Sequence, residues 1–78
     1  YPNPFNPITT FQYQLPRNSY VTLQIYNVIG QVVETLVDQR KVAGTHQVQW
    51  STNISGGVYF YRLQADDVVQ TRKLLLLK

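Results

Sequence analysis

The sequence predicts a small all-β protein, an antiparallel β-sandwich of six to seven short strands. Apolar and polar residues alternate along most of the chain, which is the period of strands with one face on a core and one face in water. Turn-forming residues interrupt this alternation about every 8–12 residues. The chain has 78 residues, enough for one core, so we expect a single domain over residues 1–78.

The first eight residues differ from the rest. Pro2, Pro4 and Pro7 each fix backbone φ, remove a backbone donor and favour an extended preceding residue. We therefore expect residues 1–8 to be a stiff, extended, proline-rich segment that leads into the sandwich. Tyr1 and Phe5 are placed to cover one open end of it.

Three runs with clear alternation follow, at residues 10–15, 21–25 and 46–50. Residues 57–65 carry apolar side chains on both faces, which is typical of a central strand. From the phase of these runs we expect a core formed by Phe11, Tyr13, Leu15, Val21, Leu23, Ile25, Val48, Trp50, Tyr59, Tyr61 and Leu63.

Residues 31–37 fit either a strand or a helical turn. We favour a strand, because the segment is short and β-branched, with a loop from Asp38 to Gly44. A last strand should run from Val68 to Leu77. Asp66 and Asp67 lie between this strand and the preceding one, as a two-residue hairpin of type I′, where aspartate tolerates positive φ better than most residues.

Composition excludes several classes of protein. Charged residues make up 14% of the chain, against about 25% in an average domain, so intrinsic disorder is not expected. There is no cysteine, and no run approaches the roughly 20 apolar residues of a membrane-spanning helix. The net charge of +3 is spread along the chain, so we expect no nucleic-acid partner and assign Arg72, Lys73 and Lys78 to a solvated rim.

Residues for catalysis or metal binding are scarce. His46 is the only histidine; it is in phase with Val48 and Trp50, which indicates a half-buried strand residue. Asp66 and Asp67 would face apart on a strand and be solvated in a turn; loop carboxylates can bind calcium, but two of them without further oxygen ligands are weak evidence for a calcium site. We expect no enzymatic activity, no cofactor and no metal.

The aromatic residues allow two interpretations. They can form a platform on which sugars stack, or they can fill the core with their hydroxyls at its edge. Alternation favours the core, and a carbohydrate-binding appendage stays as a further alternative. The residues concerned are Tyr13, Tyr26, Tyr59, Phe60 and Tyr61.

Six blocks in order resemble the type A C-terminal sorting domain of type IX secretion systems. They are residues 1–10 (Y-P-N-P-F-N-P-I-T-T), 13–16, 21–31, 43–50 ending in tryptophan, 57–63 (G-V-Y-F-Y-R-L) and 71–78. Gly56 stands where the family usually has serine, and Asp66 where it usually has glycine. Both differences lie in loops. The motif residues expected to be structural are Pro2, Asn3, Pro4, Phe5, Asn6, Pro7, Gly30, Gly44, Trp50, Gly57, Tyr59 and Tyr61.

This resemblance implies a fold and a function. Such domains are similar to immunoglobulin-like sandwiches, including one in the flagellar hook-capping protein, and follow large cargo proteins of Bacteroidota-like bacteria. The implied partners are an upstream cargo domain, an outer-membrane translocon and a sortase, and the implied location is the cell surface or the extracellular space. A signal peptide would then lie upstream of Tyr1, and Lys78 fits a natural C-terminus.

The C-terminal strand is the expected recognition element. Four consecutive leucines put apolar side chains on both faces of a strand, since successive residues point in opposite directions. One face can pack on the core, and flanking lysines keep the other face soluble. By resemblance, the secretion machinery reads Lys73, Leu74, Leu75, Leu76, Leu77 and Lys78.

A structural role is the main alternative. An open-edged sandwich can dock on neighbouring domains, or self-associate by strand addition into a surface filament. A signal peptide and a large upstream domain would favour sorting, whereas a free 78-residue subunit would favour the filament.

Overall fold

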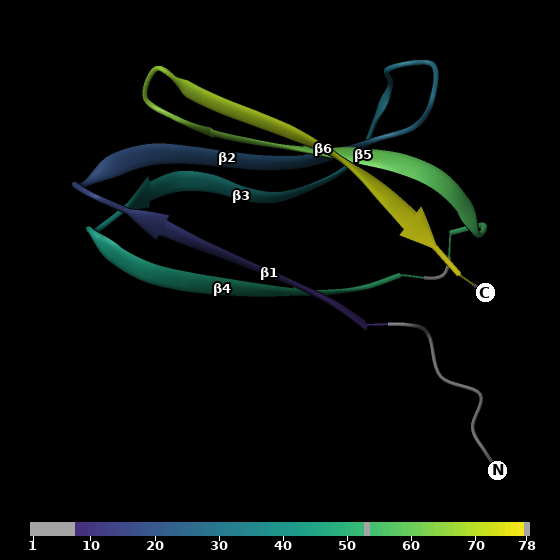
Figure 1. Cartoon of the computed structure of the whole chain (residues 1–78), viewed down its shortest axis with the longest axis horizontal. Helices are drawn as coiled ribbons and strands as arrows, with labels where there is room; N and C mark the ends of the chain where they lie inside the picture. The colour runs from purple at the N-terminus through teal and green to yellow at the C-terminus, as the bar shows by residue number, and fades with distance from the viewer. Residues whose placement is uncertain (1–7, 53, 78) are drawn as a thin grey trace, which may run out of the picture.

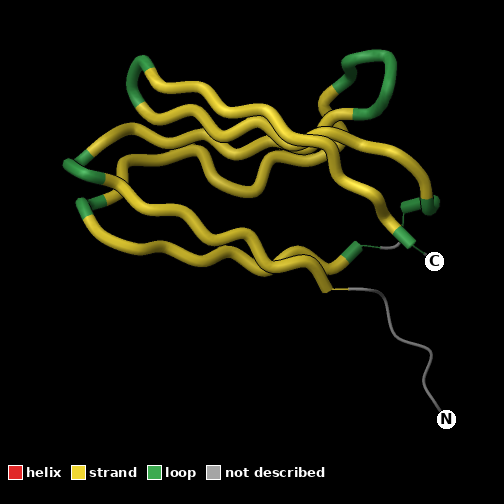
Figure 2. The backbone as a smooth tube through the Cα atoms, viewed as in Figure 1, coloured by secondary structure: helices red, strands yellow, loops and turns green. Residues whose placement is uncertain are grey.

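The computed structural model describes residues 8–52 and 54–77, and they form six strands with no helix (Figures 1 and 2). The strands are β1 (Ile8–Leu15), β2 (Ser19–Tyr26), β3 (Val32–Lys41), β4 (Gly44–Ser51), β5 (Gly57–Ala65) and β6 (Val68–Leu76). The all-β fold class is confirmed. The expectations for Tyr1 to Pro7 and for Lys78 lie outside the described residues.

The strands form two layers, which Figure 1 shows one above the other. One sheet has two strands in the order β1-β4, and the other has four in the order β3-β2-β5-β6. Every pairing is antiparallel. β5 lies between β2 and β6, which confirms that residues 57–65 form a central strand.

The core lies between the two sheets, where the inward residues of β1, β2 and β4 meet. Predicted core residues on β1 and β2, together with Trp50, are buried. Val48, Tyr59, Tyr61 and Leu63 are only half-buried and pack against this cluster. Two buried hydrophobic residues lie outside the predicted core, Val37 and Leu76. The core is therefore densest under β2 and thinner toward β6.

β3 corrects the prediction for its region. The segment is a strand, as favoured, but it continues to Lys41, so the loop expected from Asp38 to Gly44 is mostly strand. β3 is an edge strand that follows β2 along its length, with register shifts near Leu23 and Ile25. An edge strand with exposed polar residues needs no apolar alternation, which is why the pattern gave no sign of it.

Two turns show why particular residues are needed. In the β2–β3 turn, the Asn27 side-chain oxygen accepts hydrogen bonds from the backbone N–H groups of Ile29 and Gln31, at 3.1 and 2.9 Å. Gly30 has φ of 88° there, a conformation that favours glycine. The two-residue hairpin is confirmed, since Ala65 pairs with Val68, but type I′ is wrong, because that turn needs positive φ at both loop residues and Asp67 does not have it. Asp66 has φ of 54° and is the only described non-glycine residue with positive φ.

Candidate recognition surface

β6 is an edge strand of the larger sheet. It pairs with β5 along its whole length, from Gly57 opposite Leu76 to Ala65 opposite Val68. Among the described residues it has no partner on its other side. Alternate backbone N–H and C=O groups along that side are therefore available to another chain.

The run of leucines divides between the two faces of this strand. Leu76 is buried, with 3% of its surface exposed, and half-buried Leu74 packs against the core. Leu75 and Leu77 are 59% and 70% exposed, and Lys73 is exposed as well. The predicted recognition segment thus consists of inward packing residues and outward accessible ones.

The outward residues belong to a larger patch on the four-stranded sheet. Lys73 lies opposite Phe60 on β5, and Phe60 lies opposite Tyr26 on β2. Directly opposed residues point to the same face, so these three side chains form a row across three strands. Leu75 lies opposite Val58 in the neighbouring row. We call these five residues, with Arg62, the outer patch.

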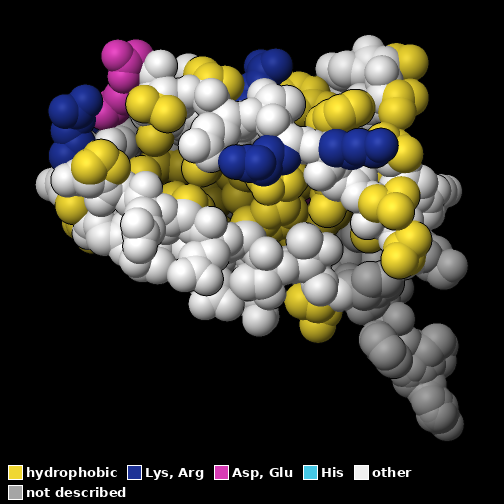
Figure 3. Space-filling view, viewed as in Figure 1, with side chains coloured by type: hydrophobic (Ala, Val, Ile, Leu, Met, Phe, Trp, Pro, Cys, Tyr) yellow, Lys and Arg dark blue, Asp and Glu magenta, His cyan; other side chains and the backbone are white. Residues whose placement is uncertain are grey.

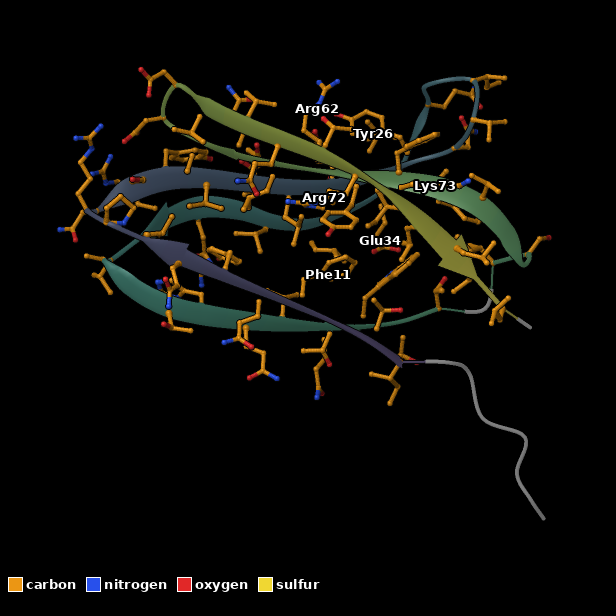
Figure 4. The ribbon with its side chains drawn as sticks, in the orientation of Figure 1. Phe11, Tyr26, Glu34, Arg62, Arg72 and Lys73 are labelled. Carbon is orange, nitrogen blue, oxygen red and sulfur yellow. The ribbon has the colours of Figure 1, made fainter. Side chains whose placement is uncertain are left out.

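Arg62 and Tyr26 are held together in this patch. The Arg62 guanidinium lies 5.1 Å from the centre of the Tyr26 ring, within the range of a cation–π contact. The Tyr26 hydroxyl donates to the side-chain oxygen of Gln24 at 2.9 Å. Figure 4 shows Tyr26 and Arg62 on the side of the sheet away from Phe11. The outer patch contains two cations and no carboxylate, so it suits an apolar or acidic partner.

The structure divides the predicted aromatic platform between two faces. Tyr26 and Phe60 lie on the outer face. Tyr13 is buried, and Tyr59 and Tyr61 pack on the core, where Tyr61 makes an edge contact with the Phe11 ring at 4.8 Å. The expectation that these aromatics form the core is confirmed for these three. A platform of all five residues is wrong, because strand alternation sends them to opposite sides.

The described motif residues lie at separate places in the two sheets, and their structural role stays a prediction. Trp50 is buried, and the Tyr59 hydroxyl donates to the Ser55 carbonyl oxygen at 2.8 Å. Gly44 begins β4 with φ of 126°, in the region that favours glycine. Gly57 begins β5 opposite Leu76. These residues do not converge on one site.

His46 is confirmed as a half-buried strand residue. Its Nε2 atom lies 2.7 Å from the Val42 carbonyl oxygen, and its ring stacks on Tyr13 at 5.4 Å. Asp66 and Arg17 approach to 3.8 Å in an exposed ion pair. Within residues 8–52 and 54–77, no three acidic or histidine side chains are grouped to hold a metal ion.

Two tyrosines have shifted acidity. Tyr20 donates a hydrogen bond of 2.6 Å to the Asp38 carboxylate, and this bond raises the pKa of Tyr20, with desolvation and the nearby negative charge adding to it. Burial raises the pKa of Tyr13. Both effects favour neutral phenols, and neither supplies an acid or base for catalysis near neutral pH.

The pairing register of the strands could not be predicted from the sequence alone. The run of leucines indicated that neighbouring side chains of β6 point to opposite faces, but not which of them face the core, and it could not place Tyr26 and Phe60 in one row with Lys73. Arg62 was not singled out, although its place between Tyr61 and Leu63 in an alternating strand already put it on the outer face.

Comparison with known proteins gives one finding. The family model described as "Secretion system C-terminal sorting domain" matches residues 1–77. Neither the curated proteins nor the solved structures gave a match. No helix in the described part of the chain is long and apolar enough to cross a membrane.

Proposed function

Because the chain belongs to the family of secretion system C-terminal sorting domains, we propose that the type IX machinery recognises it through the outward side of β6. A domain of this family is a C-terminal sorting signal for type IX secretion, and it directs the protein that carries it to the cell surface or the extracellular space. The domain therefore acts on an upstream cargo. The outer-membrane translocon and the sortase are the proposed partners.

One observation carries the choice of surface. On β6, Leu74 and Leu76 are turned inward, so a folded domain cannot present them to a receptor. Lys73, Leu75 and Leu77 are exposed on the same strand. The recognition residues are thus the outward half of the predicted segment, and the inward half keeps the strand in place.

The edge of β6 that no described strand pairs with gives a second means of attachment. A receptor strand can pair with the edge through backbone hydrogen bonds, which give affinity, while side chains at alternate positions give specificity. Phe60 and Tyr26 extend the apolar surface beside Lys73. Aromatic residues and arginine contribute strongly to binding at interfaces, and the outer patch has both.

The proposed role needs no catalysis by the domain. Family membership favours a non-enzymatic function, and the described chemistry is that of a binding surface. Cleavage and attachment of the cargo would then be performed by the partner sortase.

The test is secretion of a fluorescent cargo fused upstream of Tyr1 in a host with the type IX machinery. Leu75→Glu puts a charge in the middle of the proposed surface without touching the core. With this variant the cargo should remain in the periplasm. Val42→Glu is the matched control, since Val42 is 65% exposed and lies between β3 and β4, at the end of the molecule opposite the C-terminal end of β6 (Figure 1).

A deletion of Leu74 to Lys78 is a weaker test than these point variants. It removes buried Leu76 as well as the exposed residues, so lost secretion would not separate recognition from folding. Normal surface delivery of a folded Leu75→Glu fusion would refute the proposed surface. An equal loss of secretion with Val42→Glu would also refute the proposed surface.

A further inference from the structure

An open groove runs along one side of the sandwich, between β1 and β6. It encloses about 750 Å³, and its walls come from β1, the turn after it, β2, β5 and β6. Figure 3 shows hydrophobic side chains in the hollow between the two layers, with basic side chains along its upper rim. The floor is formed by core residues that stay reachable from this side, chiefly Phe11, Tyr61 and Leu63.

The groove exists because the two sheets differ in width. The two-stranded sheet packs on the four-stranded one, and the two-stranded sheet does not extend as far as β6. Val68 and Arg72 lie opposite Ala65 and Tyr61, so they point to the inner side of the sheet. Both are nevertheless exposed, Val68 by 56%. Among residues 8–52 and 54–77, therefore, no strand covers the inner face of β6 over its first half.

Backbone edges flank this gap. Among the described residues, β1 pairs only with β4, and β6 pairs only with β5. Each strand leaves alternate N–H and C=O groups unpaired along the side that borders the groove. A strand added beside β1 would lie about 10 Å below the four-stranded sheet, which is the normal spacing of packed sheets.

The charge of the groove is positive. Arg72 lines it and points toward the layer that holds Phe11 (Figure 4). No ion pair of Arg72 is formed within the described residues, where the one salt bridge joins Arg17 to Asp66 at the end of the groove. Among the described residues that line the groove, the one acid is Asp66, which is paired with Arg17, so a carboxylate entering beside Arg72 would meet a cation that has no ion-pair partner there.

We propose that this groove binds an extended segment of a partner protein as a third strand beside β1. The segment would place apolar side chains on Phe11, Tyr61 and Leu63, and a carboxylate opposite Arg72. Pairing with β1 would supply backbone hydrogen bonds, and the apolar floor would supply burial. The volume also suits a small ligand, but two unpaired strand edges favour a chain that can pair with them.

A second copy of this protein fits the groove less well. Its own β6 would bring Arg72 and Lys73 toward another Arg72. The carboxylates within its strands, Glu34 and Asp38, lie on β3. Because β3 is already paired with β2, it could enter the groove only together with the rest of its sheet. Charge and space therefore both point to a separate acidic and apolar segment.

This site is independent of the proposed recognition surface, because it uses the inner side of β6 and the edge of β1. The test titrates the 78-residue chain with a synthetic peptide of the length of β1. The peptide alternates valine with threonine and carries one glutamate in the valine register, to face Arg72. Amide NMR spectra should show shifts along Ile8–Leu15 and at Tyr61, Leu63 and Arg72.

The variants use neighbouring residues of one strand. Arg72→Glu should weaken peptide binding roughly tenfold or more, as loss and reversal of a charge partner does. Lys73→Glu makes the same charge change on the outer face and should alter binding less than about twofold, since it lies outside the groove and is screened by solvent. A peptide with lysine in place of glutamate should bind weakly to the native chain and regain affinity for Arg72→Glu.

Three results would overturn the proposal. One is no saturable binding by the peptide, and another is equal weakening by both variants, which would mean unspecific charge attraction. The third is a concentration-dependent dimer with its shifts on β1, which would make a second copy the occupant. None of these measurements involves secretion, so failure here leaves the sorting test unaffected.

Discussion

Replacing Leu76 and Leu75 singly by alanine tests the division of β6 into a packing face and an accessible face. The two residues are neighbours of the same type, yet 3% of Leu76 and 59% of Leu75 is exposed. Replacing Leu76 by alanine gives up most of the transfer free energy of a buried leucine, which is about 1.5–3 kcal/mol, and it leaves a cavity. Replacing Leu75 by alanine gives up less than half of that free energy and leaves no cavity.

The expected losses in the free energy of unfolding follow from these positions. Buried leucine to alanine costs about 2–5 kcal/mol. Leu76 is the last residue of its strand, where neighbours can partly close the gap, so we expect the lower part of this range, about 2–3 kcal/mol. Leu75→Ala should cost at most about 1 kcal/mol, close to the usual range of surface substitutions.

Urea denaturation followed by Trp50 fluorescence measures both variants. With a slope of about 1 kcal/mol/M for a chain of this size, the midpoint should fall by about 2–3 M for Leu76→Ala and by less than about 1 M for Leu75→Ala. Equal shifts of the urea midpoint for the two variants would refute the assignment of Leu76 to the inner face and Leu75 to the outer face. A larger shift for Leu75→Ala would reverse the two faces and remove the basis of the recognition surface.

Three further predictions concern the core, pH and metals. Trp50→Ala should destabilise the domain by about 3–5 kcal/mol, because Trp50 is 4% exposed and its loss opens a cavity; a shift under about 1 kcal/mol in urea would place Trp50 on the surface. Since the folded state raises the pKa of Tyr20 above its ordinary value of 10.0, the contribution of Tyr20 is complete below that pH and is lost as the pH rises through the folded-state pKa. The melting temperature should therefore fall in strong alkali, and Tyr20→Phe should reduce this fall, whereas an identical alkaline profile for the variant would contradict the Asp38 hydrogen bond as its cause. A chelator should leave the melting temperature unchanged, and a drop that calcium reverses would reveal a site at Asp66 and Asp67.

The sequence was sufficient for what depends on alternation. Phe11, Val21 and Ile25 were predicted to be buried from a period of two, and the structure confirms this. The Asp66–Asp67 hairpin follows from local turn chemistry, since two polar residues separate two apolar runs. These features depend on residues close together in the chain.

Features that depend on distant pairing could not be predicted. The sequence does not say that β1 pairs with β4 alone, and so it gave no sign of the groove. The extension of β3 to Lys41 depends on β2 as its template, because Asp38 and Arg40 do not alternate with apolar residues. For the same reason Leu63 and Tyr61, in phase with the core, are only half-buried, since the described strands of the smaller sheet, β1 and β4, do not extend over the whole of the larger one.

Crosslinking from β6 in secreting cells tests the central claim most directly. A photoreactive amino acid is placed at the position of Leu75 in a fluorescent fusion, and a second fusion carries it at Val42 as the control. We predict that position 75 crosslinks to an outer-membrane component of the type IX machinery while the cargo is in transit, and that position 42 does not. Normal secretion with no crosslink from position 75, or with the same crosslink from both positions, would contradict recognition through the outward side of β6.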